Sequence, residues 1–319
     1  NQLTVRDSNF YAIKNLPEVF TSGRFFLLLL VLFVACSNSN SETGEQIEPK
    51  TNTELVGYQD ALLPEIDSFS RAEIITQLKL KTAEKKPLIV RVFVPLCDNK
   101  NQGIVPVSST LGDGQNLKTN LYWGALYGVK THFIKQGWQR VGGQLQVNDT
   151  ILERIIFEKI IDSNRVIIIA DAYAGNHMAA CLNHFFEALA DIEKINVTLD
   201  NNEVINCYQP DLVAFTGHNG LMDVMVDILL NPKAKKKDAI VLACISNNFF
   251  SERLNYINAY PLITTKTLMA PEAYVLNDAI MAWAKMEADA VIYNKAITAY
   301  SNYQKCSVKA ASTVFKTGW

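Results

Sequence analysis

Two stretches of the sequence decide the fold that we expect: residues 211–223 (DLVAFTGHNGLMD) and residues 238–250 (DAIVLACISNNFF). Each contains an apolar run typical of a buried strand, and each run stops at a residue with acid–base or nucleophilic chemistry. The first run leads to His218 and the second to Cys244, 26 positions later. If the runs form neighbouring parallel strands, both side chains emerge at the same carboxyl edge of the sheet, where open α/β folds place their sites. A thiol beside an imidazole can act as a cysteine nucleophile with its general base.

The rest of the chain alternates between short apolar runs and amphipathic stretches. The pattern predicts strands at residues 88–95, 165–170, 211–216, 239–243 and 263–268, and a short strand or a turn at residues 138–147. It predicts helices at residues 71–81, 121–136, 151–161, 178–191, 222–230, 247–257, 272–285 and 289–303. Short apolar strands separated by helices predict an α/β fold, a three-layer sandwich with a mainly parallel central sheet covered on both faces.

The N-terminal region has the pattern of a secretion signal. Arg24 precedes an apolar run at residues 25–35 (FFLLLLVLFVA), and Cys36 follows. Eleven residues rise only about 16 Å as a helix, too little to span a bilayer comfortably, so a signal peptide fits better than a membrane span. A small residue before Cys36 resembles a bacterial lipobox, in which the cysteine is lipidated. The alternative is a buried apolar strand or helix.

These features divide the chain into three parts. Residues 1–36 are expected to be a signal and lipobox region, and the polar residues 37–54 a disordered linker. Residues 55–319 then form one α/β domain, held at the bacterial cell envelope, on its periplasmic face or on the cell surface, by a lipid anchor.

Composition argues against several classes of function. The net charge is −2 and the basic residues are scattered, so we expect no nucleic-acid partner. The densest basic run, residues 233–237 (KAKKK), is expected to be a solvated turn. The cysteines and histidines show no close ligand spacing, so we expect neither a metal nor a cofactor. Five cysteines remain after Cys36, an odd number, which leaves at least one free thiol.

His218 and Cys244 each have a structural alternative. His218 lies between two glycines that would leave its ring accessible, yet a histidine after a strand is more often a hydrogen-bonded structural residue. Cys244 is by default a buried, inert thiol. Ser246 and Asn247 would favour the thiolate if they cap the next helix and bring its positive N-terminus near the sulfur.

Together the two segments resemble the strands of caspase-haemoglobinase (clan CD) cysteine peptidases, and residues 240–246 (IVLACIS) are especially similar to those of the caspase-like CHAT-type peptidases. The resemblance implies that His218 is the general base and Cys244 the nucleophile. It also implies an oxyanion hole formed by the backbone N–H groups of Gly220 and Cys244. The family has glycine directly after the histidine and two positions after the cysteine, where this chain has Asn219 and Ser246.

A second group of candidates follows the strand at 165–170. Asp171, Tyr173 and His177 would reach the same sheet edge and could bind substrate. The alternative is a loop in which Asp171 accepts hydrogen bonds from backbone N–H groups.

The sequence therefore predicts a lipid-anchored cysteine peptidase that hydrolyses a peptide or protein substrate. The main alternative is a non-catalytic surface lipoprotein of the same fold that binds a partner or a glycan. A hydrolase of another class, built around Asp171 and His177, is a third.

Overall fold

The computed structural model describes residues 68–319. The predicted lipobox at Cys36 and the predicted linker at residues 37–54 lie outside the described residues. The described residues all belong to one unit.

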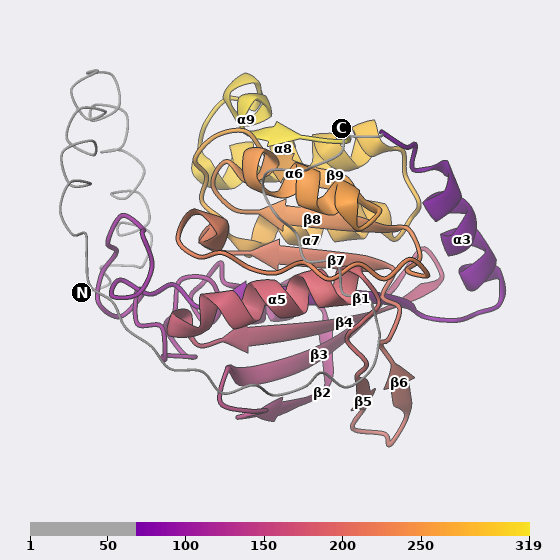
Figure 1. Cartoon of the computed structure of the whole chain (residues 1–319), viewed down its shortest axis with the longest axis horizontal. Helices are drawn as coiled ribbons and strands as arrows, with labels where there is room; N and C mark the ends of the chain where they lie inside the picture. The colour runs from indigo at the N-terminus through magenta and orange to yellow at the C-terminus, as the bar shows by residue number, and fades with distance from the viewer. Residues whose placement is uncertain (1–67) are drawn as a thin grey trace, which may run out of the picture. The chain divides into compact units, whose positions relative to one another are not determined.

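An eight-stranded sheet forms the centre of this unit (Figure 1). Its strands, in spatial order, are β10 (Phe315–Lys316), β9 (Ala259–Thr265), β8 (Lys237–Leu242), β7 (Leu212–Thr216), β1 (Leu88–Pro95), β4 (Asn164–Tyr173), β3 (Ile151–Ile161) and β2 (Gln139–Leu145). The five strands from β9 to β4 pair in parallel, whereas β10, β3 and β2 are antiparallel to their neighbours. The predicted α/β class with a mostly parallel sheet is confirmed.

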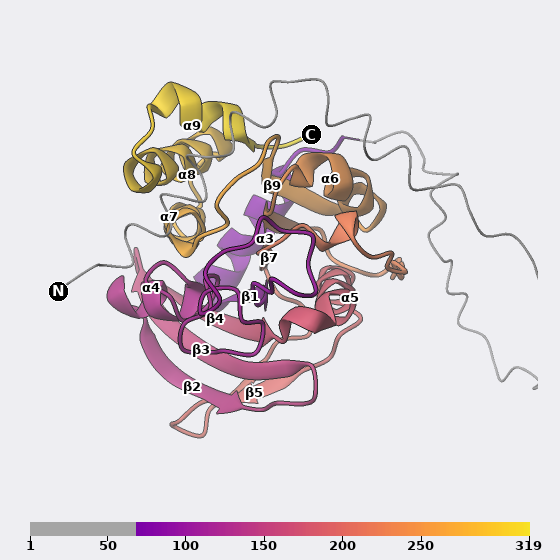
Figure 2. The same cartoon turned by 90° about the vertical axis from the view of Figure 1, so that its left-hand side faces the viewer.

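Helices cover both faces of the sheet, as Figure 2 shows. One face packs against α4 (Val129–Lys135), α7 (Ala273–Trp283), α8 (Asp289–Gln304) and α9 (Val308–Val314), and α3 (Ala72–Ala83) contributes to the same core. The other face packs against α5 (Met178–Leu189) and α6 (Ser246–Tyr256). Because the central strands are covered on both faces, all eight residues of β1 are buried.

A small hairpin of β5 (Asn196–Thr198) and β6 (Val204–Asn206) stands apart from the main sheet. Its Val197 and Ile205 pack against Ile167 and Ile169 of β4. Among the described residues, no helix is long and apolar enough to cross a bilayer.

The helix predicted at residues 151–161 is wrong, because this segment is β3. It forms an antiparallel hairpin with β4, and the two residues between them, Asp162 and Ser163, have φ values of 48° and 68°. Such a turn reverses the chain between strands. The isoleucines of this segment suit a strand, and the short apolar run did not distinguish the two.

The helices predicted at residues 121–136 and 222–230 are also partly or wholly wrong. In the first of these segments only Val129–Lys135 is helical. The residues before it form turns that bring Gly128 against the backbone of Trp123. A Cβ added to Gly128 would lie 2.4 Å from the Trp123 carbonyl oxygen. The second contains a short 3-10 turn, Gly220–Met222, and then no regular structure.

The ends of the described chain meet. The Trp319 indole N–H donates to the Phe69 carbonyl oxygen at 3.2 Å, and their rings pack edge to face with centroids 5.5 Å apart. In both Figure 1 and Figure 2 the C-terminus lies beside the start of the described chain.

Two buried titratable groups lie on the α7 side of the sheet. His132 of α4 is surrounded by the rings of Tyr127, Tyr274 and Tyr303, and burial lowers its pKa to about 4. Glu272 accepts a hydrogen bond from the Tyr274 hydroxyl at 3.1 Å, and burial raises its pKa to about 7. In the folded state near pH 6, His132 is therefore neutral and Glu272 is largely protonated.

These two groups predict opposite dependences of stability on pH. Between pH 6.5 and 4 the unfolded chain protonates His132 while the folded chain does not, so the contribution of His132 to stability is lost as the pH falls through that window. The folded chain holds the Glu272 proton up to about pH 7 and the unfolded chain only to about 4.5, so the contribution of Glu272 is lost as the pH rises through that window. We expect the destabilisation caused by His132→Gln to shrink on acidification, and that caused by Glu272→Gln to grow.

Denaturant unfolding at pH 4.5, 5.5, 6.5 and 7.5 measures both differences against the parent protein. A free-energy difference for His132→Gln that does not vary with pH would contradict a buried neutral imidazole.

Candidate functional site

The two strands that decide the fold bring His218 and Cys244 to one edge of the sheet. β7 and β8 are parallel neighbours, with Thr216 opposite Leu242 at their carboxyl ends. His218 and Cys244 each follow two residues after these paired positions. The predicted placement of both residues at the same edge is confirmed.

His218 is held by a carboxylate that sequence analysis did not single out. Its Nε2 lies 2.6 Å from Oδ2 of Asp223, which also accepts a hydrogen bond from the Gly103 N–H at 3.1 Å. The His218 ring is 7 % exposed, so this contact fixes its orientation in a nearly closed setting. The sequence placed Asp223 in a helix, whereas the actual turn after Gly220 brings it back to the histidine.

Cys244 is half-buried, and its sulfur contacts a backbone segment instead of the imidazole. The thiol lies 3.6 Å from the Met269 carbonyl oxygen, to which it donates, and 3.5 Å from the Met269 N–H. Burial raises the pKa of Cys244. Within the described part of the chain, no hydrogen bond joins Cys244 to His218, so in this state the thiol is neutral and the dyad is not assembled.

The predicted helix cap beside Cys244 is wrong. Ile245 is the N-cap of α6, and no side chain caps the helix there. The Ser246 hydroxyl instead donates to the Val241 carbonyl oxygen at 2.8 Å and accepts from the Thr265 N–H at 2.9 Å. Ser246 therefore joins β8 to β9 and does not lower the pKa of the thiol.

Ile245 occupies a strained backbone conformation directly after Cys244. Its φ and ψ are 52° and 32°, the left-handed region, which costs a β-branched residue roughly 1–2 kcal/mol. The Ile245 N–H donates to the Thr267 carbonyl oxygen at 2.9 Å, which helps to hold the turn. Such strain is concentrated at functional sites, and here it turns the chain sharply from β8 into α6 around Cys244.

Asn219 ties the histidine loop to the cysteine loop. Its Nδ2 donates to the Cys244 carbonyl oxygen at 2.7 Å, and the residue is fully buried. Its Oδ1 is a buried acceptor without a hydrogen-bond partner among the described residues. Gly220 is buried beside Met178 of α5, where an added Cβ would lie 2.3 Å from the methionine side chain. The position that the family resemblance assigns to the oxyanion hole is therefore closely packed.

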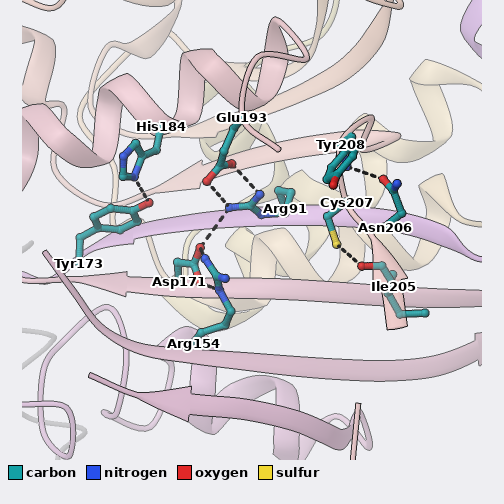
Figure 3. A network of polar contacts seen from close by, with 10 residues as sticks. All are labelled: Arg91, Arg154, Asp171, Tyr173, His184, Glu193, Ile205, Asn206, Cys207 and Tyr208. Carbon is teal, nitrogen blue, oxygen red and sulfur yellow. Dashed lines mark hydrogen bonds and ion pairs between the residues drawn. The ribbon is translucent and has the colours of Figure 1, made fainter. Parts of the chain in front are cut away.

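The second group of candidates does not join this site. Asp171 lies inside β4, and its carboxylate is fully buried between Arg91 of β1 and Arg154 of β3 (Figure 3). Both carboxylate oxygens accept from arginines, at 2.6–3.1 Å. The structure thus supports neither the role of Asp171 in substrate binding nor the alternative in which it accepts from loop N–H groups.

Tyr173 and His177 are also separate from His218. The Tyr173 hydroxyl lies 2.8 Å from Nδ1 of His184 on α5, and the Tyr173 ring is fully buried (Figure 3). His177 is half-buried at the end of a 3-10 turn, Gly175–His177, that leads into α5. Neither side chain forms a hydrogen bond with the His218–Asp223 pair in the part of the chain that is described.

The Asp171 network predicts a large effect on stability. Arg91 also pairs with Glu193 at 2.6 Å, so one buried arginine bridges two carboxylates (Figure 3). Removing the Asp171 charge leaves Arg91 with Glu193 alone and takes from Arg154 its ion-pair partner among the described residues. We expect Asp171→Asn to lower the free energy of unfolding by about 3 kcal/mol.

Denaturant unfolding measures this loss, and Asp149→Asn provides the matched control because Asp149 is exposed. The control is expected to change stability by less than about 0.5 kcal/mol. Equal effects of the two substitutions would show that the network does not stabilise the fold.

Among residues 68–319, no group of three or more histidine, cysteine or acidic side chains is arranged to hold a metal ion. In comparisons with known proteins, no family model matches this chain, and no curated protein or solved structure matches it.

Proposed function

We propose that this chain is a caspase-like cysteine peptidase in which His218 is the general base and Cys244 the nucleophile. The observation that carries the proposal is the parallel pairing of β7 with β8, which presents both residues at one sheet edge. The Asn219–Cys244 hydrogen bond joins their two loops. The resemblance of residues 240–246 to the cysteine strand of CHAT-type peptidases supports the same assignment.

The proposed reaction assigns a task to each group. The His218 imidazole accepts the thiol proton, and Sγ of Cys244 attacks the carbonyl carbon of a peptide bond to form a tetrahedral oxyanion. The oxyanion collapses, the C–N bond breaks, and the amine leaves with the proton from the imidazolium. Water then hydrolyses the thioester, with His218 again acting as base. Backbone N–H groups of Gly220 and Cys244 are proposed to stabilise the oxyanion.

Asp223 is a positioning residue in this scheme. Its contact with Nε2 of His218 leaves Nδ1 as the nitrogen that can accept the thiol proton, and its charge stabilises the imidazolium that forms. The Gly103 N–H holds the carboxylate in turn. This arrangement gives His218 the orientation that a general base requires.

The resting state needs one movement before reaction. The sulfur of Cys244 contacts both the backbone N–H and the carbonyl oxygen of Met269, so substrate binding must displace residues 266–271 or turn the cysteine side chain toward His218. Burial also raises the pKa of the Cys244 thiol. The thiol is then deprotonated by the base during the reaction, not held beforehand as a thiolate.

We also propose that the chain is lipidated at Cys36 and tethered to the bacterial cell envelope, with peptides or proteins as substrates. The apolar run before Cys36 and the polar residues that follow support this tether.

A second function, non-catalytic binding of a partner or glycan, is favoured by one observation. The thiol of Cys244 is occupied by Met269 and makes no hydrogen bond to His218 in the described structure. Under this alternative Cys244 is a structural residue and the His218–Asp223 pair serves only to fix its loop.

The two proposals predict different outcomes for peptide cleavage. We expect the parent chain, under reducing conditions, to cleave some members of a proteome-derived peptide library. Cys244→Ala and His218→Ala should each lower kcat/KM by about 10³-fold or more, because they remove the nucleophile and its base. Asp223→Asn should cause a smaller loss and alter the pH profile, because it acts through His218. Mass spectrometry of the new peptide termini is the measurement.

Matched controls are Cys306→Ala and His177→Ala, which change a half-buried cysteine and a half-buried histidine elsewhere. Both should cleave as the parent does. Absence of cleavage by the parent, or cleavage that survives Cys244→Ala, would overturn the peptidase proposal.

A further inference from the structure

A large cleft lies at the opposite end of the sheet from His218 and Cys244. Its volume is about 1050 Å³, and it is lined by α3 and the turn after it, by Asp191 and Lys194, by residues 206–211 and by residues 231–237. Asp211 directly precedes β7 and Lys237 begins β8, so the cleft lies at the amino ends of these two strands. It is separate from the proposed peptidase site and does not depend on that proposal.

The lining of this cleft is strongly basic. It includes seven lysines and three acidic residues, a surplus of four positive charges on a chain whose net charge is −2. Positive charge is thus concentrated in one concave place, which focuses the potential felt by an anion.

Two of the acidic residues are fully engaged within the protein. Asp191 forms an ion pair with the buried ammonium of Lys237 and accepts the backbone N–H of Lys235 at 2.9 Å. Asp211 pairs with Lys81 at 2.5 Å.

The expectation of a solvated turn at residues 233–237 is wrong for Lys237, which begins β8 and is 2 % exposed.

The third acidic residue, Glu84, pairs with Lys86 at 2.6 Å. By contrast, the ammonium groups of Lys194, Lys233 and Lys235 have no ion-pair partner among the described residues. All three residues are exposed. Three uncompensated cations from two separate segments therefore face a cleft whose carboxylates are already neutralised.

We propose that this lysine cleft binds a soluble molecule that carries several phosphate groups. Each phosphate in a linked chain offers several acceptor oxygens and at least one negative charge, so a chain of two or three matches three ammonium groups better than a single carboxylate does. The cleft volume suits a small molecule of this kind.

Two other anionic partners fit the cleft less well. Single-stranded nucleic acid is held by stacked bases on aromatic side chains as well as by charge, and Tyr208 is the single aromatic residue in the lining. Anionic lipid headgroups lie on a flat surface, whereas these lysines surround a concavity.

Titration calorimetry of the full chain with sodium tripolyphosphate tests the proposal. We expect saturable binding to the parent, and a Kd at least about tenfold higher for the double substitution Lys233→Gln and Lys235→Gln. The matched control, Lys100→Gln with Lys118→Gln, removes the same charge from residues outside the cleft lining and should bind as the parent does. Circular dichroism establishes that each variant is folded.

Three outcomes would overturn the proposal. The first is the absence of saturable tripolyphosphate binding by the parent. The second is an equal loss in the control variant, which would show a general effect of net charge. In the third outcome, the protein does not bind tripolyphosphate but sediments with vesicles of phosphatidylcholine and phosphatidylglycerol, and this sedimentation is lost when Lys233 and Lys235 are substituted. That result would identify the cleft as a lipid contact. Loss of cleavage by Cys244→Ala has no bearing on any of these results.

Discussion

The parallel register of β7 with β8 is the constraint on which the rest of the structure depends. Both strands are buried along their whole length, so every backbone group in them must pair with a neighbouring strand. A slip of one residue would turn the apolar side chains of Val213 and Val241 from one face of the sheet to the other. The register therefore fixes where each strand ends, and with it the positions of His218 and Cys244.

Much of the fold could be predicted because its signals are local. The apolar run that became β1 was predicted with the bounds that the structure has, and α7 and α8 followed from helical periodicity. The failure at residues 151–161 has a physical cause, since a short isoleucine-rich segment fits either a strand or a buried helix until its partner is known. That partner, β4, is fixed by pairing across a turn and not by the segment itself.

The candidate site shows where local information ends. The placement of His218 and Cys244 at one edge followed from two strands, but the groups they contact did not. Met269, which holds the Cys244 sulfur, is 25 positions away, and Arg91, which binds Asp171, is 80 positions away. No periodicity in one sequence links such positions. Asp223 was closer in sequence to His218, and it was missed because the turn after Gly220 was expected to be helical.

The contact between Trp319 and Phe69 has a consequence for how the fold is connected. These residues are 250 positions apart, yet they touch, so the backbone of the described domain nearly closes on itself. If the two neighbouring ends were joined, the chain could be opened at another loop without changing the spatial order of the strands, as in other domains whose ends are neighbours. A short peptide joining the two ends, with a new opening beside the highly exposed Met225, would preserve every strand pairing and make a circular permutant of the domain.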